Sequence, residues 1–190
     1  MLRIMVVDED DERRAVLRGS LEAAGHRVVD EVASTLHLAR RVARVQPDLI
    51  IIDTHSPDRD TLEDVCVVTQ DAPRPIVMFC ADGDARRIRE AVNSGVSAYI
   101  VGGLPSERVQ PVLDLAIAQF ETLQSLRQEL ESAQSQLASR KRIEQAKAIL
   151  MERKQLSEPQ AYRLLRKMAM DENLKLTEVA EQVIRAARLL

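Results

Sequence analysis

Short apolar runs alternate with helical patterns along the first 105 residues. Five runs of strand length occur in this part, at residues 4–7, 28–29, 48–53, 75–79 and 98–101. The third run is almost wholly apolar between its two aspartates, which is typical of a strand buried on both faces of a sheet. The alternation predicts the α/β class, with a five-stranded doubly wound parallel sheet.

One long helix is expected after the fifth run. From Glu107 to Lys154 the chain has no Gly, and its only Pro stands in the first turns, with room for one break near Ser139. Along its middle, apolar residues recur at spacings of three and four, as in a coiled coil. This seam consists of Leu123, Leu126, Leu130, Ala133 and Leu137. It predicts a coiled-coil linker over 107–138 that forms a homodimer. The alternative is an amphipathic helix packed on its own N-terminal domain.

The last fifty residues have the pattern of a small three-helix bundle. Ser157 and Pro159 mark a helix start, Asn173 closes that helix, and Thr177 is expected to cap the last one. The middle helix carries an apolar stripe made of Ala161, Leu164, Leu165, Met168 and Ala169. Three short helices of this kind can share only a small core, which would depend on the dimer seam for stability.

Composition excludes several classes of protein. Hydrophobic residues make up 45% of the 190 residues and charged residues 30%, which is typical of a globular chain. No apolar run reaches the length of a membrane span, and the first residues read as a strand rather than a signal peptide. Two cysteines do not make a disulfide scaffold. We expect a cytoplasmic protein that is not an enzyme, because no nucleophile and base stand together at a strand end.

Charge divides the chain into two unlike parts. Residues 1–120 contain 14 Arg, no Lys and 20 acidic residues, whereas residues 121–190 contain 13 basic and 10 acidic residues. Every lysine lies between Lys141 and Lys175. The sequence therefore predicts an acidic module joined to a basic one that could meet a polyanion.

Acidic side chains follow two of the predicted strands. Asp8 and Glu9 come at the end of the first strand, and Asp53 ends the third. The carboxyl ends of parallel strands meet at one edge of the sheet, so we expect these carboxylates to lie close together. Three carboxylates can hold Mg²⁺, which would let Asp53 act as a nucleophile toward a phosphoryl group.

Residues 1–120 resemble the receiver domain of two-component response regulators. The motifs that carry this resemblance are Val6 to Glu9, Pro47 to Asp53 with Pro57 four residues on, Pro75 to Met78, and Ser94 to Tyr99. The resemblance implies a flavodoxin-like fold in which Asp53 accepts the phosphoryl group and Asp8 and Glu9 bind the metal. It also implies that Tyr99 is the aromatic switch position.

Two switch positions depart from the receiver pattern. Cys80 stands where the family has Thr or Ser, and Gly102 stands where it has Lys. A lysine ammonium at position 102 would pair with the phosphoryl group. In this chain only an arginine such as Arg86 could replace that ammonium. We therefore favour a pseudo-receiver controlled by a bound protein over a receiver switched by phosphorylation of Asp53.

Residues 139–190 resemble the ANTAR domain. The resemblance lies in Arg140 to Met151, Ser157 to Met170 and Asn173 to Ile184. It implies binding to stem-loops of a nascent leader transcript, which prevents a terminator from forming. The expected RNA contacts are Arg140, Lys141, Arg142, Lys147, Tyr162, Arg163, Arg166, Lys167 and Lys175.

Together, a receiver-like domain, a coiled coil and an ANTAR domain resemble the AmiR and NasT group of antiterminators, with NasT the nearer. This resemblance implies control of nitrate and nitrite assimilation genes, and an inhibitory nitrate-sensor partner of NasS type. One alternative is an ANTAR response regulator activated by phosphorylation of Asp53. A second is a DNA-binding response regulator, although a convincing helix-turn-helix is missing.

Overall fold

The computed structural model describes residues 1–102 and 108–188, so Gly103 and the helix start expected at Pro105 lie outside the described residues. Its strands are β1 (Arg3–Asp8), β2 (Arg27–Val32), β3 (Leu49–Thr54), β4 (Ile76–Cys80) and β5 (Ala98–Val101). Its helices are α1 (Asp11–Ala23), α2 (Leu38–Val45), α3 (Arg59–Asp71), α4 (Ala85–Asn93), α5 (Val109–Lys154), α6 (Glu158–Asp171) and α7 (Leu176–Arg188).

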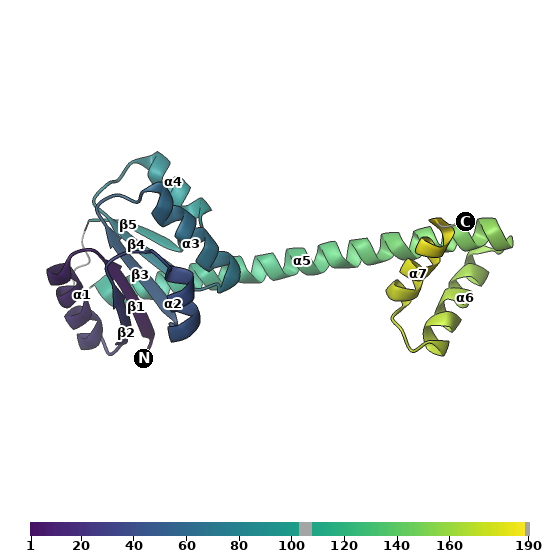
Figure 1. Cartoon of the computed structure of the whole chain (residues 1–190), viewed down its shortest axis with the longest axis horizontal. Helices are drawn as coiled ribbons and strands as arrows, with labels where there is room; N and C mark the ends of the chain where they lie inside the picture. Colours follow the sequence, from purple (N-terminus) through teal and green to yellow (C-terminus); the bar gives the residue numbers. More distant parts are fainter. Residues whose placement is uncertain (103–107, 189–190) are drawn as a thin grey trace. The chain divides into compact units, whose positions relative to one another are not determined.

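The five strands form one parallel sheet in the order β2-β1-β3-β4-β5, which confirms the predicted fold class (Figure 1). Alternate strand residues point to opposite faces, so each face has its own core. One core joins the sheet to α1 and the first turns of α5, including Leu17, Leu21 and Leu113. The other joins it to α2, α3 and α4 through residues such as Val42, Val65 and Ala91. Both faces are covered, as the apolar strands require.

The chain divides into two compact units, Met1–Gln124 and Ser125–Leu190. In the second unit, the end of α5 packs with α6 and α7. Its buried core consists of Ala146, Leu150, Ala161, Leu165, Ala169, Val179 and Ala180. The stripe predicted on the middle helix thus faces this core. None of the described helices combines the length and the apolarity that crossing a membrane requires.

Two details of the helices differ from the sequence expectation. Helix α5 runs through Ser139 without a break, because neither Ser139 nor Arg140 lacks a backbone donor or favours another conformation strongly enough to end a helix. The last helix begins at Leu176, so Thr177 is not its cap. Instead the Lys175 carbonyl accepts the backbone N–H of Glu178, whose carboxylate accepts the Lys175 N–H at 2.7 Å. Asn173, at φ 53°, closes α6 as predicted.

Candidate functional site

The acidic residues meet at the carboxyl edge of the sheet, where the strand order reverses. Asp8 and Asp53 are partners in the register of β1 and β3, the two strands on either side of this point. Asp8, Glu9 and Asp53 line a cavity of about 470 Å³. The sequence prediction that acids from two strand ends converge here agrees with this geometry.

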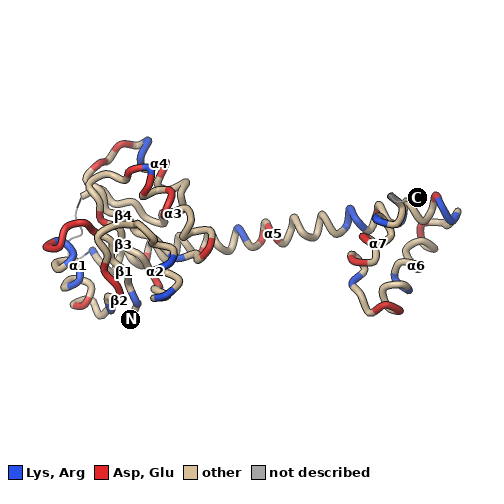
Figure 2. Tube along the Cα trace, viewed as in Figure 1, with Lys and Arg blue, Asp and Glu red and all other residues tan. Residues whose placement is uncertain are grey.

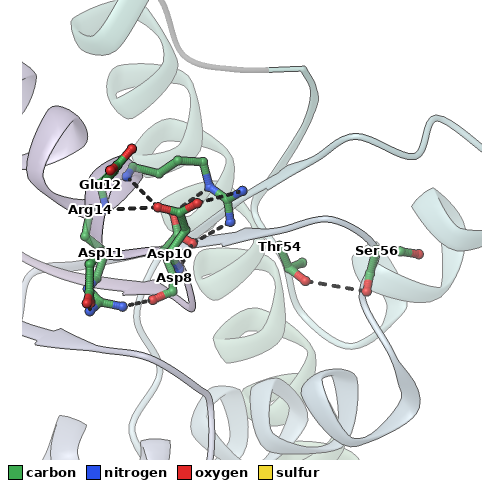
Figure 3. Close-up of polar contacts among 8 residues, drawn as sticks. Asp8, Asp10, Asp11, Glu12, Arg14, Thr54 and Ser56 are labelled. Carbon is green, nitrogen blue, oxygen red and sulfur yellow. Dashed lines mark hydrogen bonds and ion pairs between the residues drawn. The ribbon is translucent and has the colours of Figure 1, made fainter.

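The Asp8 carboxylate is fully buried and bound by an arginine that no sequence motif singled out. Arg13 donates from Nη2 to Oδ1 of Asp8 at 2.7 Å and from Nε to Oδ2 at 3.1 Å. The backbone N–H of Asp10 also donates to Oδ1, at 2.9 Å. Figure 3 shows Asp8 and Asp10 together at the start of α1. Two parallel hydrogen bonds of this kind are the strong form of an arginine–carboxylate pair.

The first turn of α1 positions this arginine. Asp10 is the N-cap residue, and its side chain accepts the backbone N–H groups of Glu12 and Arg13 at 2.9 and 3.0 Å. These bonds lower the pKa of Asp10, the one from Arg13 most. The hydrogen bond to Asp8 in turn raises the pKa of Arg13, which is charged at any physiological pH. The sequence does contain a signal for the position of Arg13, because this residue lies in the first helical turn after the capping residue Asp10.

Asp53 is partly buried beside this ion pair. Burial raises the pKa of Asp53, the nearby negative charge of Asp8 raises it further, and the positive charge of Arg13 opposes both effects. Arg13 and Asp53 also line a second cavity, of about 370 Å³, together with Phe79. Among the described residues, the guanidinium of Arg13 is thus a positive charge that acts on both Asp8 and Asp53.

Receiver domains in general bind Mg²⁺ at this edge, and the residues of this chain were predicted to do the same. Among residues 1–102 and 108–188, no three His, Cys, Asp or Glu side chains are placed to hold a metal ion together. Both oxygens of Asp8 accept from Arg13, and Glu9 is exposed. As they are placed, Asp8, Glu9 and Asp53 do not fit a divalent ion.

Of the three switch positions, Cys80 ends β4, Tyr99 lies within β5 and Gly102 comes directly after β5. Cys80 is buried, and burial raises the pKa of its thiol. The Tyr99 hydroxyl donates to the carbonyl of Asp82 at 2.8 Å, and burial raises its pKa as well. Gly102 follows β5 with φ 91°, a conformation that favours glycine. Thiol and phenol are thus both neutral near pH 7.

Two arginines of α4 have different surroundings. Arg87 connects two loops, since it bonds to Ser56 and Pro57 after β3 and to Asp82 after β4 at 3.1 Å. Ser56 is itself held near Thr54 (Figure 3). Arg86, expected as a substitute for the missing lysine, is exposed and pairs with Glu90 of its own helix. By contrast, Arg13 of α1 pairs with Asp8 at the acidic edge of the sheet.

Basic residues occur in the second unit along the end of α5 and along α6 (Figure 2). Arg163, Arg166 and Lys167 are exposed on α6, and no acid among the described residues lies within ion-pair distance of them. Tyr162, the aromatic residue of this unit, is 43% exposed. The other exposed members of the predicted RNA contacts are Arg140, Lys141, Arg142 and Lys175. Of these, Arg142 pairs with Glu181 of α7 at 3.1 Å.

The structure separates Lys147 from the other predicted RNA contacts. Lys147 is 7% exposed, and its Nζ lies 2.7 Å from Glu158 of α6 and 2.8 Å from Glu144 of α5. An ammonium that is largely buried and held by two carboxylates offers little surface to a phosphate. Lys147 therefore links α5 to the start of α6 through its ion pair with Glu158, and the RNA surface proposed below does not include it.

This ion pair predicts a pH-dependent stability. Lys147 lowers the pKa of Glu158 from its ordinary value of 4.5, so the pair stabilises the fold above pH 4.5 and its effect disappears as Glu158 becomes protonated below that. We expect Glu158→Gln to lower the Tm of the second unit by on the order of 3 °C at pH 7, and by progressively less in acid. Circular dichroism measures this, with the exposed Glu152→Gln as the control; an equal loss at all pH values contradicts the prediction.

The predicted seam of α5 is uncovered in the single chain. Leu123, Leu126, Leu130 and Leu137 are 48–58% exposed, and Ala133 is exposed as well. An apolar stripe of this length on a monomer is typical of an interaction surface.

The two units match two known families of domain. Residues 4–111 match the response regulator receiver domain, and the chain belongs to that family. Residues 131–184 match the ANTAR domain, so the chain is a receiver protein that carries an ANTAR domain. It is 26% identical over 182 residues to the transcriptional regulatory protein PdtaR of Mycobacterium tuberculosis, which covers 96% of this chain and 89% of that protein.

Other relatives match the first unit alone. The chemotaxis protein CheY of Listeria monocytogenes is 25% identical over 61% of this chain and 98% of its own length. The signal receiver domain of a modulated diguanylate cyclase from Desulfovibrio desulfuricans G20 has a TM-score of 0.57 at 17% identity, over 64% of this chain and 98% of that one. These likenesses support the receiver fold.

Proposed function

We propose that this protein is a transcription antiterminator that binds stem-loops of a nascent leader RNA through its C-terminal unit. The observation that carries the proposal is the exposed basic face of α6, Arg163, Arg166 and Lys167, within the part that matches the ANTAR domain. Unpaired cations on one helix face suit phosphates, and Tyr162 beside them suits an unstacked loop base. PdtaR, a relative that spans both units, is itself a transcriptional regulatory protein.

The active form that we propose is a homodimer joined along α5. The seam residues Leu123, Leu126, Leu130, Ala133 and Leu137 are exposed in one chain and fit the knobs-into-holes packing of a second copy. Two chains joined in this way would present two basic faces, one for each of two RNA hairpins. Binding of the second hairpin then becomes intramolecular, which raises the overall affinity.

We further propose that the receiver domain acts as a surface for an inhibitory protein rather than as a phosphorylation switch. Cys80 offers a buried thiol and Gly102 no side chain at the positions that would bind a phosphoryl group. The resemblance to the AmiR and NasT group extends this proposal to a nitrate-sensor partner of NasS type, to nitrate and nitrite assimilation genes and to a cytoplasmic location. Release from such a partner is a population shift driven by ligand.

We do not propose an enzymatic activity. The methylesterase of Hahella chejuensis is 33% identical over 48% of this chain, but the match covers 27% of that protein. That stretch lies within the receiver domain that the two chains share. The likeness therefore supports a shared regulatory domain, and it does not support a methylesterase activity in this chain.

Binding of a two-hairpin leader RNA tests the proposal. At about 0.1 M salt, we expect the unphosphorylated protein to bind this RNA at least about 10-fold more tightly than duplex DNA of equal length, and Asp53→Ala to bind equally well. Acetyl phosphate with Mg²⁺ should change neither affinity. Binding that appears only after phosphorylation, and is lost in Asp53→Ala, would replace the proposal with a phosphorylation-activated regulator. Equal competition by duplex DNA would replace it with a DNA-binding regulator.

A further inference from the structure

We propose that the guanidinium of Arg13 is the resident cation of the acidic sheet edge and takes the place of a divalent metal ion there. This inference concerns the first unit alone and goes beyond the RNA-binding function, on which it does not depend. It starts from the disagreement described above, in which carboxylates that resemble a metal site do not fit a metal as they are placed.

Arg13 contacts both oxygens of the Asp8 carboxylate. The side chain of Asp8 has no exposed surface, and a buried carboxylate requires a compensating positive charge or hydrogen bonds. Arg13 supplies both, with one donor on each oxygen at 2.7 and 3.1 Å and a third group, Nη1, 3.8 Å from Asp10. No other ion pair among the described residues reaches Asp8.

A second acidic residue, Asp53, lies next to this ion pair. Asp8 and Asp53 are paired across β1 and β3, so two carboxylates lie close together at one edge. Their mutual repulsion must be reduced by a positive charge, and the lysine that receivers place at the end of the fifth strand is Gly102 in this chain. Arg13 pairs directly with Asp8, and it lines a cavity together with Asp53, whose pKa its positive charge lowers.

The backbone of Arg13 is held in the first turn of α1. The helix begins at Asp11, two residues before Arg13, and the capping carboxylate of Asp10 accepts the Arg13 backbone N–H at 3.0 Å. The guanidinium is therefore carried by a capped helical turn, and the acidic edge needs no cation from solution. A cation that belongs to the chain is always present, whereas a metal ion would bind according to its concentration.

Thermal unfolding of the full chain with and without Mg²⁺ tests this inference. In Arg13→Gln, amide groups can still donate to Asp8 but the positive charge is gone, so Asp8 and Asp53 should recruit a metal ion. We expect about 10 mM MgCl₂ to raise the Tm of the first unit of Arg13→Gln by on the order of 5 °C over the value in EDTA. The wild-type protein should change by less than about 1 °C, since its cation is already in place.

Two further variants make the result specific. Arg18→Gln is the matched control, because Arg18 lies on the same helix, is equally exposed at 47% and pairs with Glu31 at 2.9 Å, away from the edge. It should behave as the wild type. Arg13→Lys keeps a charge and should also show no response to Mg²⁺. The inference is overturned if Mg²⁺ stabilises the wild type as much as Arg13→Gln, or if Arg13→Gln shows no response.

Discussion

Replacing Arg163, Arg166 and Lys167 together by alanine is expected to weaken binding of a leader RNA by roughly 100- to 1,000-fold at about 0.1 M salt. The three side chains are exposed on α6, so alanine should leave the bundle core intact. Each cation that contacts a phosphate releases counterions from the RNA. The slope of log affinity against log salt concentration should therefore become shallower by about 2 to 3.

Fluorescence anisotropy with a labelled two-hairpin RNA, repeated at several salt concentrations, measures both effects. The control removes three exposed arginines from the first unit, Arg59, Arg86 and Arg89, which changes the net charge by the same amount. If the control variant loses as much affinity as the α6 variant, the attraction is general and the basic face of α6 is not the RNA surface.

Charge placed in the seam of α5 should break the dimer. Leu126→Glu combined with Leu130→Glu puts two like charges from each chain into a contact that the proposal makes apolar, where unpaired charges are costly. We expect the chain to become monomeric at micromolar concentration. Affinity for a two-hairpin RNA should fall by at least about 10-fold because avidity is lost, whereas affinity for a single hairpin should stay unchanged.

Light scattering after size exclusion gives the mass, and the RNA measurements use the same samples. Gln128→Glu with Ser132→Glu is the matched control, since it adds the same charge at the same spacing on exposed positions outside the seam. A wild-type monomer at these concentrations, or a Leu126 and Leu130 variant that remains dimeric, would rule out this seam as the interface.

The fold was accessible from the sequence because its signals are local. A strand buried on both faces has to be apolar at every position, and Leu49 to Ile52 shows this without any knowledge of its neighbours. The ends of helices were less accessible. Thr177 is a good capping residue, yet the helix begins one residue before it because the Glu178 carboxylate binds the Lys175 N–H.

The sequence did not predict the ion-pair partners of Lys147 and Arg13, which both have long, positively charged side chains. Composition identifies Lys147 and Arg13 as charged, but it does not say which carboxylate each one reaches. Lys147 finds Glu158 across the turn between α5 and α6, a pairing set by how two helices pack. Arg13 bends back to Asp8 at the end of a strand. Such contacts depend on tertiary geometry, whereas the convergence of Asp8 and Asp53 depends only on strand order.

The middle of helix α5 has no tertiary support within one chain. Its first turns are anchored in one core by Ala116 and its last turns in another by Ala146, and none of its residues between these two is buried. A helix without tertiary support is only marginally stable in water. In the proposed dimer, pairing of two seams would therefore order this segment as well as join the chains, so that helix formation and dimerisation would form a single equilibrium. The order of the middle of α5 would then depend on the concentration of the protein.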